Sequence, residues 1–427
     1  MNSDSASRAR RSIPWLVIAG VLVAALSLRG PIVAPTPVMR EIETDVGIGP
    51  AAAGLLTTAP VLMFALLTPV AALVIRRAGA ELALLAALSG VLLGTFVRAL
   101  PGFGWMLTGM VVIGVAIAVG NVVIPVIIRR DVPAERVVVV TAAYAATLNI
   151  GSLLTSLLTA PLAAAIGWSA ALVAWSAITA VGIVLWSVHL RRERARGRTW
   201  GERYSGAHGA TPAAAASDDI DPDTLTGPMP VVAGGRRERR LLRRPVAWLI
   251  AASFALQCTV YWALTTWLPT IAADELGYSP AAAGAVASIY QGVGVLGAFL
   301  VPLLTRFAPR AVATAVICAS WLVLMVGLLA WPELLGVWLI AGAIAHAGGF
   351  VVIFTLLVQV SRDDAEAAGL SAFVQGVGYA VGALGAPLSG LLHEATGGWT
   401  APLIGMLVLA VVYSGTLLGA SALASRR

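Results

Sequence analysis

The sequence of 427 residues contains no lysine, few charged residues and only two cysteines. Charged residues make up 11% of the chain, whereas a soluble globular domain carries roughly 25%, so an ordinary soluble protein is excluded. Cys258 and Cys318 both lie in apolar runs and provide neither a disulfide framework nor a zinc cluster. The sequence also lacks a Gly-Lys-Ser/Thr phosphate loop, a zinc-spaced His/Glu pair and a serine nucleophile motif. We therefore expect no metal, no cofactor and no enzymatic activity.

Hydrophobic residues, in contrast, make up 59% of the chain and are grouped in long runs. A run of about 20 apolar residues is long enough to cross the hydrocarbon core of a bilayer as an α-helix. Twelve such runs predict an all-α polytopic membrane protein with twelve transmembrane helices in two six-helix bundles. The expected spans are 13–39, 51–75, 81–100, 104–128, 137–166, 168–190, 246–273, 280–305, 311–331, 334–360, 366–392 and 399–424.

The arginines between these runs predict the orientation in the membrane. Cytoplasmic loops carry an excess of basic residues, and with a cytoplasmic amino terminus only Arg40 and Arg98 fall on the outer face. The arginines that then fall inside are Arg8, Arg10, Arg11, Arg76, Arg77, Arg129, Arg130, Arg136, Arg306, Arg310, Arg362, Arg426 and Arg427. We expect a plasma (inner) membrane protein with both termini cytoplasmic. The net charge of +7 thus reflects topology, and no nucleic-acid partner is expected.

One long polar stretch, residues 191–244, divides the spans into six and six. Arginine clusters at both ends enclose an Ala/Asp/Pro-rich middle that cannot bury a core, which predicts a disordered cytoplasmic linker with its basic ends against anionic headgroups. A regulatory role for this linker stays open. The expected organisation is a tail (1–12), a first bundle (13–190), the linker (191–244), and a second bundle with a short cytoplasmic tail (245–427).

The two halves repeat each other in sequence. Residues 47–54, Gly-Ile-Gly-Pro-Ala-Ala-Ala-Gly, match residues 277–284, Gly-Tyr-Ser-Pro-Ala-Ala-Ala-Gly, and Arg76 falls on Arg306 at the same offset of 230. Two further matches at similar offsets pair Arg130-Asp131 with Arg362-Asp363 and Gly167-Trp168 with Gly398-Trp399. Parallel repeats of this kind are typical of secondary transporters, whose binding site lies between the halves near the midplane of the membrane. The repeat therefore predicts transport by rocking of the two halves.

Short motifs in both halves point to a known family. They are Arg29-Gly30-Pro31, Gly54-Leu55-Leu56-Thr57-Thr58, the stretch from Gly120-Asn121 to Pro125 that leads into Arg129-Arg130-Asp131-Val132-Pro133, Gln257 with Tyr261, Trp267-Leu268-Pro269, the stretch from Leu370 to Tyr379, and Gly397-Gly398-Trp399. The chain resembles the major facilitator superfamily, and within it the cyanate permease / 2-nitroimidazole transporter family. The resemblance implies a membrane transporter and leaves the substrate open.

The general superfamily signature after the second helix, Gly-x-x-x-Asp-Arg-x-Gly-Arg-Arg, survives only in part. It reads Arg76-Arg77-Ala78-Gly79, with Arg76 at the acidic position, and Arg306 is its counterpart in the second half. The resemblance implies that these residues form a gating loop. The departure from the signature weakens any claim to the usual gating charge pair.

Ionisable residues within membrane spans are costly and are functional candidates by default. No acidic residue lies inside an apolar run, which argues against the exchange of a proton for a cationic drug. Arg29 lies near the middle of the first span, before Pro31, Pro35 and Pro37. Prolines free backbone carbonyls, and irregular backbone at this depth usually lines a cavity. We expect Arg29 to contact a carboxylate, cyanate or nitro group, the alternative being a structural arginine bonded to carbonyls.

Further polar residues lie within the spans and are candidates for substrate binding or for helix–helix hydrogen bonds. Gln257 with Tyr261 and Gln375 with Tyr379 are four residues apart, so each pair shares a helix face. The predicted substrate-binding residues are Arg29, Asn121, Asn149, Gln257, Tyr261, Gln291, Gln375 and Tyr379. His346, also within a span, is a candidate for a coupling proton, although a histidine bonded to a backbone carbonyl is the commoner case. Trp262 and Trp267 are candidates for the cavity wall.

Three functions are compared on this basis. The first is a secondary transporter, active as a monomer, for a small anion or a compact polar nitrogen compound such as cyanate, with Arg29 as the charge anchor. The second is an exporter of uncharged or aromatic compounds, such as 2-nitroimidazole-like drugs, in which tyrosines and tryptophans form the site. The third, a membrane-embedded enzyme or receptor, would need a catalytic constellation or a soluble domain that the sequence lacks. The direction of transport and the coupling ion stay open.

Overall fold

The computed structural model describes residues 15–195, 244–362 and 364–425. It gives the backbone alone for residues 68–78, 134, 135, 138, 193–195, 298, 364, 365 and 368. Within these ranges, twelve helical stretches are long enough and apolar enough to cross a membrane, so the prediction of twelve spans is confirmed. The expected tail 1–12 and most of the expected linker 191–244 lie outside the described residues; the last helix of the first half continues to Ala195.

Each half consists of helices joined by short turns. The helices of the first half are α2 (Trp15–Val33), η1 (Thr36–Val38), α3 (Met39–Val46), α4 (Pro50–Ala78), α5 (Ala80–Val97), α6 (Phe103–Asp131), α7 (Ala134–Ile166), α8 (Trp168–Ala174) and α9 (Ser176–Ala195). Those of the second half are α12 (Pro245–Leu276), α13 (Pro280–Gly292), α14 (Gly294–Phe307), α15 (Arg310–Ala330), η3 (Pro332–Leu334), α16 (Leu335–Val360), α17 (Asp364–Gly382), α18 (Gly385–Thr396) and α19 (Thr400–Ser425).

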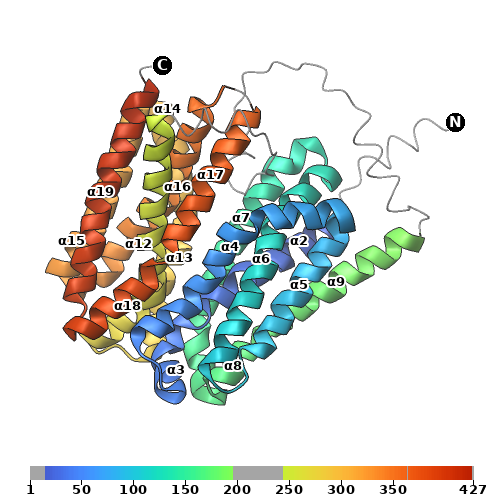
Figure 1. Cartoon of the computed structure of the whole chain (residues 1–427), viewed down its shortest axis with the longest axis horizontal. Helices are drawn as coiled ribbons and strands as arrows, with labels where there is room; N and C mark the ends of the chain where they lie inside the picture. Colours follow the sequence, from blue (N-terminus) through green and yellow to red (C-terminus); the bar gives the residue numbers. More distant parts are fainter. Residues whose placement is uncertain (1–14, 196–243, 363, 426–427) are drawn as a thin grey trace.

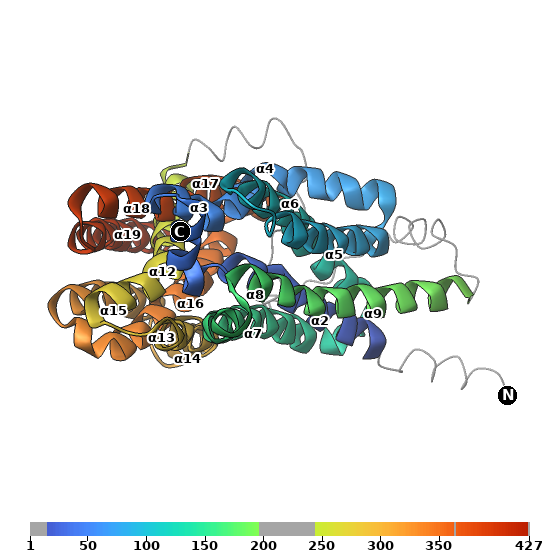
Figure 2. The ribbon, with the colours of Figure 1, turned by 90° about the horizontal axis from the view of Figure 1, so that it is seen from below.

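The two sets of helices form two bundles that lie side by side (Figure 1). Seen from below, α13 of the second bundle lies beside α7 of the first, and α18 lies beside the start of α4 (Figure 2). Apolar side chains face outward over much of both bundles, as expected where lipid takes the place of water.

Several spans are interrupted, and prolines and glycines explain most of the interruptions. The first span contains Pro31, and its helix α2 ends at Val33, before Pro35 and Pro37. The eleventh span breaks between α17 and α18 at the Gly-rich stretch around residues 382–385. Proline has no N–H to donate, so a carbonyl one turn earlier is left without its usual helical partner. Such carbonyls need another donor inside a membrane protein.

Contacts between the two bundles gather at one end of the molecule, which we call the closed end. There Arg40 forms an ion pair with Asp274 across the bundles, and the indole of Trp399 also donates to Asp274, at 2.8 Å. Nearer the centre, the hydroxyls of Thr57 and Thr266 are 2.6 Å apart. These residues lie close to the loops that join α3 to α4 and α12 to α13, and the bundles converge at this end in Figure 1.

Small residues allow this close packing. A Cβ atom added to Gly54 on α4 would lie 2.7 Å from the backbone of Ala386 on α18, closer than real side chains approach. On the other side of the interface, the hydroxyl of Ser156 donates to the carbonyl of Gly284 at 3.2 Å. Small residues and hydroxyl hydrogen bonds are the usual means of packing helices within a membrane. The segment 47–54 and its repeat 277–284 therefore both lie at the interface between the bundles.

The contact between Thr57 and Thr266 predicts a crosslink. In a background with Cys258→Ser and Cys318→Ser, the pair Thr57→Cys and Thr266→Cys should form a disulfide under mild oxidation, because the two hydroxyls are already in contact. The crosslinked fraction is measured by proteolysis between the halves followed by non-reducing electrophoresis. The matched control is Thr58→Cys with Thr266→Cys. Thr57 and Thr58 both donate to the carbonyl of Gly54 in their own helix, but the contact with Thr266 is made by Thr57. Equal crosslinking of both pairs would contradict the closed arrangement.

Candidate functional site

A cavity of about 210 Å³ lies between the two bundles. Helices of both halves line it, among them α2, α6 and α7 from the first and α12, α13, α16 and α17 from the second. Nine residues singled out in the sequence line the cavity: Arg29, Asn121, Asn149, Gln257, Tyr261, Trp262, Gln291, His346 and Tyr379. A site between the halves is where parallel-repeat transporters bind their substrates.

Arg29 is the one permanently charged side chain among the described residues that line the cavity. Its Nη2 donates to the hydroxyl of Tyr261 at 2.7 Å, which joins the first bundle to the second. The guanidinium carbon lies 5.4 Å from the ring centre of Tyr261 and 5.8 Å from that of Trp262. Aromatic faces stabilise a cation in this range. The partners of the charge are thus the hydroxyl of Tyr261 and the rings of Tyr261 and Trp262. No carboxylate belongs to the described lining.

A hydrogen-bonded chain continues from Arg29 into the second bundle. Tyr261 donates to Oε1 of Gln291 at 3.1 Å, and Nε2 of Gln291 donates to the hydroxyl of Thr265 at 3.3 Å. The ring of His346 stacks on Tyr261 with ring centres 3.8 Å apart. Because each member orients the next, this chain holds the Arg29 guanidinium in one position relative to α12 and α13.

The other amides have different partners. Nε2 of Gln257 donates to the carbonyl of His346 at 3.2 Å, and Oε1 accepts from Tyr413 at 3.0 Å, so this side chain also connects α12 to α16 and α19. Asn149 donates to the carbonyl of Ala145 within its own helix at 3.2 Å. The bonds of Gln257 agree with the alternative in which polar residues join helices, whereas the bond of Asn149 stays within α7.

Gln375 is placed differently from its expected position. It is not among the described residues that line the cavity, and its amide donates instead to the hydroxyl of Ser371, one turn earlier on α17, at 2.8 Å. Trp267 is fully buried beside α18, where its indole donates to the carbonyl of Ala386 at 2.8 Å, while Trp262 does line the cavity. Helical spacing places a residue on a face of its own helix, but the neighbouring helix decides which face borders the cavity.

Aromatic residues that sequence reasoning passed over form much of the wall. Phe64, Tyr144, Tyr290 and Phe350 all line the cavity. Helical spacing gave no signal for Tyr144, because the five residues that separate it from Asn149 turn α7 by about 140°. The cavity therefore combines one cation, several amides and an aromatic wall.

The expected gating loop lies at the opposite end of the first bundle. Gly79 has φ of +82°, which favours glycine, at the junction of α4 and α5. Arg306 lies in the last turn of α14, with its guanidinium carbon 5.7 Å from the ring centre of Phe307. The side chains of Arg76 and Arg77 lie outside what the structure describes, so their expected gating role is neither supported nor contradicted by contacts.

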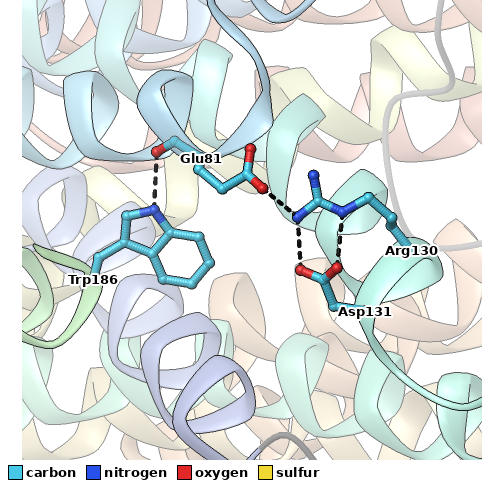
Figure 3. A network of polar contacts seen from close by, with 4 residues as sticks. All are labelled: Glu81, Arg130, Asp131 and Trp186. Carbon is cyan, nitrogen blue, oxygen red and sulfur yellow. Dashed lines mark hydrogen bonds and ion pairs between the residues drawn. The ribbon is translucent and has the colours of Figure 1, made fainter. Parts of the chain in front are cut away.

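Next to this loop, a charge network joins three helices of the first bundle (Figure 3). Arg130 at the end of α6 pairs with Glu81 of α5 and with Asp131, each at 2.7 Å. The indole of Trp186 on α9 donates to the backbone carbonyl of Glu81 at 2.9 Å. Glu81 is largely buried, so this pair ties the start of α5 to α6 more firmly than an exposed pair would.

Arg98 was expected on the outer face, but the structure buries it completely. Its backbone lies at the junction of α5 and α6, while the guanidinium reaches inward and donates to the carbonyl of Pro31 at 2.6 Å and to that of Leu172 at 3.2 Å. The span holding Arg29 therefore lies against a second buried arginine. The sequence analysis counts Arg98 with the outer arginines because it lies near the end of the expected span 81–100.

The fold and this site define a membrane transporter, and comparison with known proteins gives the family. The family model described as Major Facilitator Superfamily matches residues 17–383. The chain belongs to the major facilitator superfamily and is a multi-pass membrane transporter.

Curated relatives cover nearly the whole chain. The chain is 31% identical over 402 residues to the "2-nitroimidazole transporter" of Escherichia coli (strain K12). The aligned region covers 93% of each chain. It is 23% identical to the "Cyanate transport protein CynX" of the same organism, covering 89% of this chain and 90% of that protein. The resemblance stated from the sequence motifs is thereby confirmed.

Solved structures share the fold. A bacterial homolog of the human lysosomal transporter Spinster, in an inward-facing and unoccupied conformation, superposes with a TM-score of 0.71 at 16% identity over 96% of this chain and 98% of that one. The D-xylose-proton symporter superposes with a TM-score of 0.69 at 11% identity, covering 97% of each chain. The prediction of the major facilitator fold is confirmed.

The placement of the polar residues predicts a labelling pattern. In a background with Cys258→Ser and Cys318→Ser, Asn149→Cys should react with a small methanethiosulfonate reagent, because Asn149 borders the cavity. Gln375→Cys is the matched control and should react far more slowly, since Gln375 is buried against its own helix. The modified fraction is measured by mass spectrometry. Faster labelling at position 375 than at position 149 would contradict the cavity geometry.

Proposed function

We propose that this protein is a secondary active transporter for a small anion or a compact polar nitrogen compound, such as cyanate, and that Arg29 is the charge anchor for the substrate. The observation that carries the proposal is the charge balance of the cavity. Arg29 is permanently charged and borders the cavity, and the described lining residues include no carboxylate that would neutralise it. An unneutralised cation within a membrane protein is costly, and an anionic substrate relieves that cost.

The geometry of Arg29 fits such a ligand. A guanidinium presents a planar fork of N–H donors that suits carboxylate, nitro and cyanate groups. One arm already donates to Tyr261, which fixes the plane of the fork. Beside the fork, the ring of His346 stacks on Tyr261, and the ring of Trp262 meets Tyr261 edge to face. A small planar molecule can stack against aromatic rings of this kind. The site thus selects for a compact planar ligand with an electron-rich end.

A second function, export of uncharged aromatic compounds, is favoured by the aromatic wall of the cavity. Phe64 and Tyr379 contact edge to face across the two bundles, with ring centres 5.7 Å apart, and Phe350 borders the same space. In this function, stacking provides the binding energy, and Arg29 has the structural task of joining the bundles through Tyr261. The relative named as a 2-nitroimidazole transporter is compatible with either function, because a nitro group can accept from Arg29 and its ring can stack.

We further propose that the cavity opens toward the cytoplasm in this conformation, in the plasma (inner) membrane, with both termini cytoplasmic. The support is that Arg40 and Asp274 pair at the closed end, whereas the arginine-rich junctions near Arg130 and Arg310 lie at the other end. Basic loops favour the cytoplasmic side. Opening to the outside then requires the Arg40–Asp274 pair to separate. A role for His346 in carrying a proton stays a prediction.

Uptake by proteoliposomes tests the role of Arg29. With pH clamped, we expect saturable uptake of one or more of cyanate, acetate and 2-nitroimidazole, and we expect Arg29→Gln to reduce kcat/KM for anions by about 10²-fold, the effect of losing roughly 2.7 kcal/mol of charge-assisted bonding. Gln375→Leu is the matched control and should leave KM unchanged, because Gln375 does not border the cavity.

The result also separates the two functions. If anions are not transported and 2-nitroimidazole moves equally in the wild type and in Arg29→Gln, then the anion proposal is wrong and the aromatic exporter replaces it. Trp262→Ala then provides the positive test, because it removes part of the aromatic surface beside Arg29.

A further inference from the structure

Two helix breaks in the first bundle leave backbone carbonyls that need donors. The last four carbonyls of a helix have no partner within that helix. In α2 the carbonyl of Gly30 accepts from the N–H of Ala34 at 2.8 Å. The next carbonyl, that of Pro31, would accept from residue 35, but Pro35 has no N–H. The carbonyl of Leu172 lies in the last turn of α8, before the chain turns at Trp175 into α9.

Arg98 supplies donors to both carbonyls. Its Nη1 donates to Pro31 at 2.6 Å and its Nη2 donates to Leu172 at 3.2 Å. The side chain is fully buried, and its other near partner is the sulfur of Met110, at 3.6 Å from Nη1. Helix carboxyl termini carry partial negative charge and stabilise a cation. The ends of α2 and α8 therefore take the place of a carboxylate partner for this guanidinium.

The surrounding packing makes this position rigid. The backbone N–H of Arg98 donates to the carbonyl of Gly94 at 2.9 Å. A Cβ atom added to Gly109 on α6 would lie 2.4 Å from that nitrogen and 2.6 Å from the Cβ atom of Arg98. Only glycine leaves room for this approach, so α6 presses the start of the Arg98 side chain into place. The reach of the guanidinium then determines where the end of α2 can lie.

We propose that Arg98 is a positioning residue for substrate binding: by donating to the carbonyls of Pro31 and Leu172, it holds the end of α2 so that Arg29 meets Tyr261 and the cavity. Arg29 precedes Pro31 by two residues, and Ile32, which follows it, also lines the cavity. A shift of the Pro31 carbonyl therefore moves residues on both sides of it. The inference rests on the proposed function of Arg29 as the charge anchor.

The prolines offer a suppressor that distinguishes this role from a general contribution to stability. Pro35 has φ of −66° and ψ of −25°, which alanine also adopts without strain. The substitution Pro35→Ala restores an N–H one turn after Pro31, in position to donate to the same carbonyl that Arg98 serves. In Arg98→Met, we expect the added change Pro35→Ala to recover much of the lost function, although it adds no charge and lies outside the cavity.

The experiment compares wild type, Arg98→Lys, Arg98→Met, Pro35→Ala, the double variant Arg98→Met with Pro35→Ala, and Arg29→Gln in proteoliposomes. For the compounds of the panel that the wild type transports, we expect Arg98→Met to raise KM about tenfold, which corresponds to ~1.4 kcal/mol of binding. The maximal rate should change by less than about twofold. Arg98→Lys keeps a buried donor but loses the planar fork of the guanidinium, so its KM should lie between those of the wild type and Arg98→Met. Pro35→Ala should lower KM again in the double variant.

Amide hydrogen exchange gives a readout that does not depend on the substrate. Exchange in residues 32–39 should rise in Arg98→Met and fall again in the double variant, while residues 400–425 of α19 serve as the internal control. The inference is overturned if exchange in 32–39 does not change, if Pro35→Ala restores nothing, or if KM is unchanged in Arg98→Met while Arg29→Gln raises it. An Arg29→Gln protein with wild-type kinetics overturns the proposed function instead, so the two failures are distinguishable.

Discussion

The requirement that every buried backbone group finds a partner governs this structure. In a membrane the hydrocarbon offers no hydrogen bonds, so a helix can be interrupted only where the protein itself supplies the missing donor or acceptor. The helix of the first span ends at Val33, before Pro35, and Arg98 lies where the missing donor is needed. The cost of burying this cation is offset because it meets carbonyls that the interruption left free.

The same requirement explains the different surroundings of the two buried arginines. Arg98 is enclosed by carbonyls and a sulfur atom, at the ends of two helices. Arg29 has a phenol and two aromatic faces as its partners and borders open space. A guanidinium surrounded by carbonyls has no need of a ligand, whereas one that borders a cavity without a carboxylate favours an anionic or electron-rich ligand. The difference between the two arginines therefore lies in their partners.

The interface between the bundles connects the site to movement. At the closed end the bundles touch through small residues and hydroxyls, and through the Arg40–Asp274 pair. At the cavity they touch through Arg29 and Tyr261. A ligand that takes over donors of Arg29 acts directly on a bond between the bundles. With Arg29 as the proposed charge anchor, substrate binding and the rocking of the halves would share atoms, which is a physical basis on which a transporter couples binding to a change in access.

The sequence by itself determined the membrane class, the number of spans, the division into two halves and the family. These follow from properties that are local along the chain, since a run of about 20 apolar residues has one stable solution in a bilayer. It also identified Arg29 and most of the polar residues that border the cavity, because a polar residue within an apolar run stands out.

Only the tertiary structure decided that Gln375 bonds to Ser371 rather than facing the cavity, and that Tyr290 and Phe350 form its wall. It alone revealed that Arg98 reaches back to Pro31, 67 residues earlier in the chain. The neighbouring helices decide which face of a helix meets a cavity and whether an arginine at a helix end turns inward. The sequence of a single apolar run does not specify those neighbours.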